Sequence, residues 1–177
     1  MTGGRKRFPR CIRLDPSDVS VFDPAAEPGE WAVSGAFAFA RLASEDLTGK
    51  TRQAFAHGFL GLGSFGRSTL VVVSEIDDAE YEAVIAALAG HFVAHYGAPD
   101  LAAARPAAEE EAAFALSLCD HPVNTLLAVS REMEERGIVE SFRVITPEAP
   151  KSHAKIWEFV EAQDDAPEDD TPRENEN

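Results

Sequence analysis

The fold prediction depends on residues 57–73, HGFLGLGSFGRSTLVVV, the most apolar and most glycine-rich part of the chain. Residues 70–73 form an unbroken apolar run with three β-branched valines, which is typical of a buried strand. Gly61, Gly63 and Gly66 precede this run, and glycine supplies positive φ angles and close backbone approach in tight turns. The stretch therefore predicts a hairpin between strands, with at least one of these glycines at positive φ.

The same glycines fit two nucleotide-binding patterns only in part. In the dinucleotide pattern G-x-G-x-x-G a helix follows directly, so that its N-terminus meets the pyrophosphate, whereas a strand follows here. Residues 60–67 also resemble the glycine-rich loop of protein kinases. However, no lysine lies between Lys50 and Lys151 to hold the phosphates, and neither H-R-D nor D-F-G occurs. An anion site built from exposed N–H groups of the turn, with Ser64, Arg67 and Ser68, stays open.

The rest of the chain predicts an α+β fold. Period-two patterns and apolar runs predict strands at 8–14, 30–42, 51–60, 67–76 and 138–145. Helical spacing predicts helices at 77–96, 106–119, 122–136 and 154–161, with a capping box at Asp77 and Pro106 in a first turn. Strands in a row followed by helices favour an antiparallel sheet of about four to five strands, with helices packed mainly on one face. We expect one domain over residues 7–163, between a disordered basic segment 1–6 and a disordered acidic tail 164–177.

Composition limits the partners and the compartment. The 177 residues are 45% hydrophobic, and the net charge is −15 although five basic residues lie in the first thirteen. An acidic body repels phosphate backbones, so we expect no nucleic-acid partner. No signal peptide and no apolar run of about 18 residues occurs, which predicts a cytoplasmic protein without a membrane partner.

Several residues that often carry chemistry have a structural interpretation here. His57 lies between two phenylalanines, and a core-flanking histidine is the favoured interpretation over a catalytic one. His91 and His95 have metal-ligand spacing but lack the H-E-x-x-H glutamate, so we expect no metal and no cofactor, although His57 or His121 could supply a third ligand. Cys119, next to Asp120 and His121, is expected to be a small core residue rather than a nucleophile.

A resemblance rests on three segments of the chain. These are residues 58–69 (GFLGLGSFGRST), residues 95–99 (HYGAP) and residues 119–122 (CDHP). Together they resemble a small bacterial family of unknown function, over most of residues 10–148. The resemblance implies a compact cytoplasmic protein and carries no activity with it.

Two functions compete. The first is a non-enzymatic binding or accessory protein whose partner is another protein; it is favoured because no complete catalytic set of residues occurs. The alternative is a small enzyme or an anion- or nucleotide-binding protein that uses the glycine-rich hairpin 58–69. Its candidate ligand-binding residues are Gly61, Gly63, Ser64, Gly66, Arg67, His57 and His121. The alternative gains if the side chains of His57, Arg67, His91 and His121 converge on a pocket of several hundred Å3.

Overall fold

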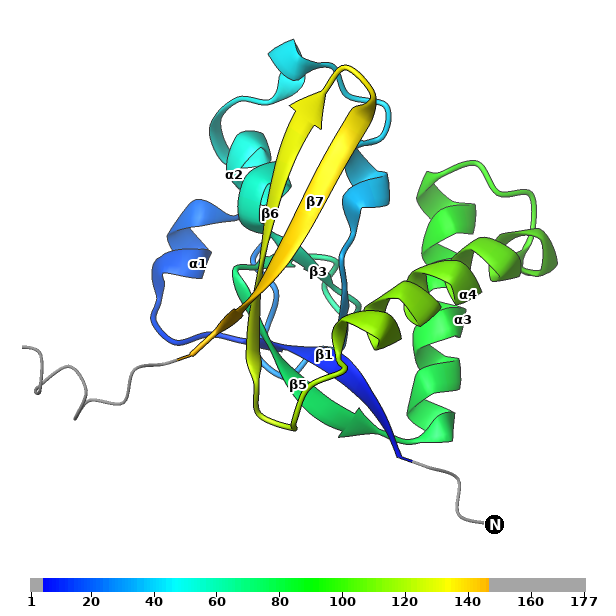
Figure 1. The fold of residues 1–177 in the computed structure, drawn as a ribbon. Coiled ribbons are helices and arrows are strands. Elements are labelled where there is room, and N and C mark those ends of the chain that lie inside the picture. Colours follow the sequence, from blue (N-terminus) through cyan, green and yellow to red (C-terminus); the bar gives the residue numbers. More distant parts are fainter. Residues whose placement is uncertain (1–4, 147–177) are drawn as a thin grey trace, which may run out of the picture. The chain divides into compact units, whose positions relative to one another are not determined.

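The computed structural model describes residues 5–146 as helices and antiparallel strands (Figure 1). In chain order they are β1 (Lys6–Ile12), α1 (Ser17–Val21), β2 (Ala32–Val33), η1 (Ala36–Phe39), η2 (Ser44–Asp46), α2 (Gly49–His57), β3 (Phe59–Gly61), β4 (Arg67–Ser68), β5 (Leu70–Ile76), α3 (Asp78–His95), α4 (Leu101–Leu118), β6 (Leu126–Glu134) and β7 (Gly137–Ile145). The predicted α+β class is confirmed. The predicted helix 154–161, the predicted tail 164–177 and residues 1–4 lie outside the described residues.

The larger sheet contains four strands in the order β1-β5-β6-β7, and each neighbouring pair is antiparallel. β1 and β5 pair along their whole length, from Lys6 opposite Ile76 to Ile12 opposite Leu70. β6 and β7 form a long hairpin in which Leu126 lies opposite Ile145, and this hairpin rises away from β1 and β5 in Figure 1. The predicted antiparallel sheet and the return of residues 138–145 to it are confirmed.

The glycine-rich hairpin 58–69 lies in a second, smaller sheet with the order β2-β3-β4, whereas the apolar run 70–73 that follows it begins β5 of the larger sheet. The turn of the hairpin joins β3 to β4, where Phe59 lies opposite Ser68, so the predicted hairpin is confirmed. The prediction of a glycine at positive φ in this turn is wrong. Phe65 adopts the left-handed conformation instead, at φ 56°, and none of the three turn glycines does.

The two long helices begin at capping aspartates. Asp77 accepts a hydrogen bond from the Glu80 N–H at 2.8 Å, and the Glu80 carboxylate accepts one from the Asp77 N–H at 2.9 Å, which is the predicted capping box. α4 begins earlier than predicted, after the cap Asp100, so Pro106 lies inside the helix rather than in its first turn. α3 and α4 pack on each other, and α4 lies against β1 (Figure 1).

The strands predicted at 51–60 and 30–42 are wrong over most of their length. Residues 51–60 form α2 up to His57, and only β3 after Gly58 is extended, so the alternating phenylalanines belong to two different elements. Residues 30–42 form the short strand β2, and Gly35 then turns the chain at φ 77° into the 3-10 helix η1. A regular strand does not continue through a residue at positive φ, so the period-two pattern of residues 30–42 predicted a longer strand than forms.

The predicted helix at 122–136 is wrong, because this segment forms strand β6. The buried run Leu126 to Val129 has apolar side chains on both faces, as in the interior of a sheet. Gly137, expected to stop a helix, instead has φ 122° at the start of β7 and follows the tight turn of the hairpin. Pairing with β7 therefore overrides the local helical spacing.

Two clusters of buried side chains make up much of the core of residues 5–146. One joins Phe8 and Ile76 of the larger sheet to Leu88 of α3, and the other contains Phe59 of β3 and Val129 of β6. Among residues 5–146 no helix combines the length and the apolar character that crossing a membrane requires.

Candidate functional site

The N–H groups of the glycine-rich turn bind an anion that belongs to the chain itself. Glu30 Oε1 accepts hydrogen bonds from the backbone N–H groups of Gly63 and Ser64, both at 2.7 Å. Glu30 Oε2 accepts from the Ser64 hydroxyl at 2.7 Å and from the Glu27 N–H at 2.5 Å. Burial by itself would raise the pKa of Glu30, but the hydrogen bonds from Ser64, Glu27 and Gly63 outweigh it and lower the pKa. The predicted anion site at the turn therefore holds a carboxylate of the chain.

The other two turn glycines serve close packing. A Cβ at Gly66 would lie 2.5 Å from the carbonyl carbon of Ala25, and a Cβ at Gly61 would lie 2.6 Å from Glu30 Oε1. The Gly66 N–H donates to the Ser64 hydroxyl at 3.0 Å. These contacts confirm the predicted close approach of backbone at the hairpin and explain why Gly61 and Gly66 are glycines without any ligand.

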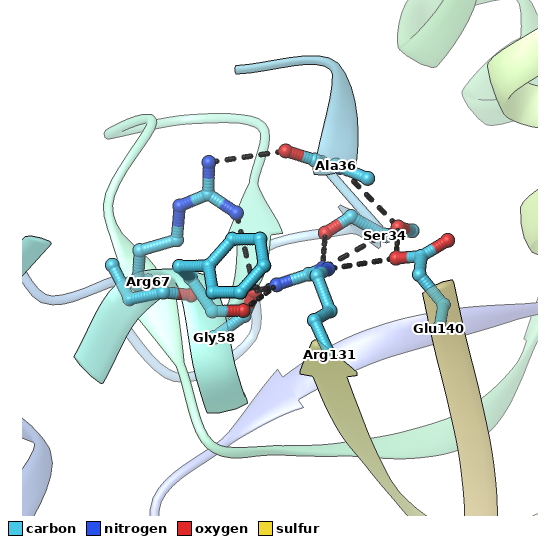
Figure 2. Close-up of polar contacts among 9 residues, drawn as sticks. Ser34, Ala36, Gly58, Arg67, Arg131 and Glu140 are labelled. Atoms are coloured by element: carbon cyan, nitrogen blue, oxygen red, sulfur yellow. Dashed lines mark hydrogen bonds and ion pairs between the residues drawn. The ribbon is translucent and has the colours of Figure 1, made fainter. Parts of the chain in front are cut away.

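Arg67, the first residue of β4, has a guanidinium that is almost entirely enclosed, and the residue is only 8% exposed. Nη1 donates to the Gly58 carbonyl at 3.1 Å (Figure 2). Nη2 donates to the Gly35 carbonyl at 3.2 Å. Among residues 5–146, no carboxylate forms an ion pair with Arg67. Burial, with the charge of Arg131 nearby, lowers the pKa of Arg67 to about 9.

A second buried guanidinium, Arg131 on β6, has a carboxylate partner. Its Nε lies 2.7 Å from Glu140 Oε2, and Glu140 also accepts a hydrogen bond from the Ser34 hydroxyl (Figure 2). Its terminal nitrogens donate to the carbonyl of Ser34 and to those of Phe55 and Gly58, the last two at 2.8 and 2.9 Å. Burial is the larger influence and lowers the pKa of Arg131, although Glu140 acts in the opposite direction. Nothing in the local sequence predicts this cluster, because the partners of Arg131 come from distant segments.

The two guanidiniums are neighbours. The Gly58 carbonyl accepts a hydrogen bond from each of them, and Figure 2 shows it between them. The ring of Phe39 lies 4.6 Å from Cζ of Arg67 and 5.7 Å from Cζ of Arg131. Because Glu140 pairs with Arg131, Arg67 contributes a positive charge with which no carboxylate of residues 5–146 forms an ion pair.

Arg67 lines a cavity of about 370 Å3, which we call the Arg67 pocket. The residues around it are Ala38, Leu60, Phe65, Arg67, His91, His95 and Tyr96. The Phe65 ring stacks flat on the His91 imidazole, with ring centroids 3.9 Å apart. Burial, followed by the nearby His95 and Arg67, lowers the pKa of His91. The pocket thus brings together a guanidinium that is cationic at neutral pH, two imidazoles and a phenol, with no carboxylate among the residues that line it.

The comparisons with known proteins identify a family. The model of a family of unknown function, DUF6505, matches residues 6–159, which is most of the chain. The chain belongs to the DUF6505 family. No curated protein and no solved structure matches it. The resemblance to a family of unknown function is confirmed, and membership of DUF6505 assigns no activity.

Of the three histidines expected to meet Arg67 in this DUF6505 chain, two do not. His57 is exposed at the end of α2 and lines a different cavity, of about 670 Å3, between α2 and the β6–β7 hairpin. His121 lies in the loop before β6, where its carbonyl accepts a hydrogen bond from Arg7 at 2.7 Å. His91 is the histidine that joins Arg67 in one pocket. Of the four side chains expected to meet, those of Arg67 and His91 do so, and those of His57 and His121 lie elsewhere.

The remaining chemical candidates of this DUF6505 domain are placed as follows. Cys119 is buried, and burial raises the pKa of its thiol to about 12, which keeps it protonated and poorly nucleophilic at neutral pH. The rings of His91 and His95 lie 4.9 Å apart. Within residues 5–146, no three histidine, cysteine or acidic side chains are grouped closely enough to hold a metal ion.

Proposed function

We propose that the protein is a non-enzymatic binding protein whose ligand is a small anion held in the Arg67 pocket. The observation that carries the proposal is the buried guanidinium of Arg67, which has two carbonyl partners and no carboxylate partner in the described part of the chain. Burying a charge is costly unless an opposite charge compensates it. An anion in the pocket would supply that charge.

The other residues of the pocket suit such a ligand. Arginine has five N–H donors in a planar fork, and two hydrogen bonds from this guanidinium are to backbone carbonyls, so donors remain for a ligand. His91 and His95 of α3 add further polar groups, as does Tyr96 at the C-cap of this helix. A volume of about 370 Å3 lies in the range of small-molecule pockets. The glycine turn takes no direct part, because Glu30 occupies its N–H groups.

The proposal is tested by titrating the protein with sulfate and with phosphate at constant ionic strength, adjusted with chloride. Saturable heats in calorimetry and a rise in Tm are expected, since a ligand at a hundred times its Kd adds about 2.7 kcal/mol to stability. Equal melting temperatures in sulfate, phosphate and chloride, with no saturable heat, would contradict the proposal.

Ala38 offers a variant that leaves Arg67 in place. Because Ala38 lines the pocket, Ala38→Asp should put a carboxylate near the guanidinium, keep the protein folded and abolish anion binding. Ala40 lies just after the same 3-10 helix but is exposed and is not among the residues of the pocket, so Ala40→Asp is the matched control and should bind as the wild type does. Equal affinities of the two variants would show that the anion binds elsewhere.

A further inference from the structure

The side chain of His91 is held by rings on two sides. Phe65 covers one face of the imidazole in a flat stack, with the ring planes inclined by 2°. Phe37 of η1 approaches it edge-on, with centroids 6.3 Å apart. Phe65 has this position because its backbone adopts φ 56°, a conformation that few non-glycine residues occupy and that is found disproportionately at binding sites.

The charged and titratable groups around His91 are Arg67 from β4, His95 from its own helix, and Tyr96 at the C-cap of that helix. The turn and η1 contribute the apolar rings of Phe65 and Phe37. Consequently, while the pocket is empty, the positive charge of Arg67 and partial burial both disfavour the protonated form of the His91 imidazole. This agrees with the lowered pKa of His91. An anion bound to Arg67 would reverse the sign of the nearest charge, and an opposite charge favours the protonated imidazole.

We propose that the anion binds in the Arg67 pocket together with a proton, which a ring nitrogen of His91 takes up from the solvent. This inference rests on the proposed function and adds its regulation: occupancy follows pH as well as anion concentration. No bond of the anion is made or broken, and the proton returns to solvent when the anion leaves. Because the bound state holds more protons, affinity is greatest at acid pH and falls as pH rises between the two pKa values of His91.

The probe for the test is sulfate, whose own charge does not change near neutral pH. Calorimetric titrations from about pH 5.5 to pH 8.5 should show affinity falling with rising pH, by at most about tenfold per pH unit for one proton. The same titration in two buffers with different ionisation enthalpies should give different heats, which measure proton uptake directly.

Three variants locate the proton. His91→Gln should still bind sulfate through Arg67, with no proton uptake and with an affinity that stays constant from about pH 5.5 to pH 7.5, where Arg67 remains charged. His57→Gln is the control, because this exposed histidine lines the other cavity, and it should behave as the wild type does. Loss of proton uptake in His95→Gln but not in His91→Gln would overturn the assignment to His91. Saturable binding without proton uptake by the wild type would overturn the coupling alone, whereas no saturable binding at any pH would overturn the proposed function as well.

Discussion

Replacing Glu111 with glutamine should change how the stability of the protein depends on pH. Glu111 lies on α4, and its Oε2 atom is buried without a hydrogen-bond partner among the described residues. Burial, together with the charges of Glu140 and Glu110, raises the pKa of Glu111 to about 7, although Arg131 acts in the opposite direction. Ionising this carboxyl group in the folded protein is therefore costly.

The sign and the size of the effect follow from proton linkage. A carboxyl group with a raised pKa binds its proton more tightly in the folded state, so it does not destabilise the protein at acid pH. A penalty develops as pH rises from the ordinary value of 4.5 to about 7, and it stays constant above that. A difference of one in pKa corresponds to about 1.4 kcal/mol, so the penalty is at most about 3 kcal/mol. Partial exposure of the side chain reduces it to about 1–2 kcal/mol.

Urea denaturation of wild type and Glu111→Gln at about pH 5 and pH 8 measures this penalty. The free energy of unfolding of the variant, relative to wild type, should increase by about 1–2 kcal/mol between the two pH values. Any constant cost of the buried amide cancels in that comparison. Glu110→Gln removes the same charge from an exposed neighbouring position and should show a change below about 0.5 kcal/mol. A pH-independent difference for Glu111→Gln would refute the argument, as would equal behaviour of the two variants.

Three further substitutions test the contacts around the site. Glu30→Gln should lower the free energy of unfolding by about 1–3 kcal/mol at neutral pH in urea denaturation, since turn N–H groups lose a charged acceptor. Because the pKa of Glu30 is lowered in the fold, the stabilities of the variant and the wild type should converge as pH falls through that pKa. A difference in stability that persists in acid would contradict this. Gly66→Ala should lower Tm because the new Cβ overlaps the Ala25 backbone. Gly90→Ala in α3 is the control and should leave Tm unchanged or raise it, because a Cβ there has no atom within 4 Å. Equal shifts in Tm for the two variants would argue against the overlap. Arg131→Met should lower the free energy of unfolding by about 3–5 kcal/mol, because it leaves a carboxylate and several carbonyls unpaired. Arg143→Met on the exposed side of β7 is the control. A loss of stability below about 1 kcal/mol for Arg131→Met would show that water replaces the guanidinium.

Local chemistry allowed several parts of the fold to be predicted from the sequence. The capping box at Asp77 and the apolar stripe after it define α3, and both depend on residues within a few positions of each other. The hairpin at residues 58–69 follows from its glycines and the valine run, and the strand at 138–145 follows from its pattern of side chains. In each case the interactions that select the structure lie close together in the chain.

The parts that could not be predicted depend on distant partners. Leu126, Leu127 and Ser130 have spacing suited to a helix, and pairing with β5 on one side and β7 on the other makes their segment a strand. Arg131 looks like one charge in a solvated run, because the carbonyls that enclose it come from segments 73 to 97 positions away. Arg67 was a candidate for its place in the glycine-rich hairpin, but its neighbours on α3 and the missing carboxylate are visible only in three dimensions.

The carbonyl of Gly58 links the two sheets, because it accepts hydrogen bonds from Arg67 on β4 and from Arg131 on β6. If the end of α2 frays, both buried cations lose an acceptor at the same moment, and each then bears a large desolvation cost. Such an opening is therefore expensive unless the surrounding strands separate too. We expect the amide protons of the hairpin 58–69 and of β6 to exchange with solvent in one cooperative event, although one segment belongs to the small sheet and the other to the large one.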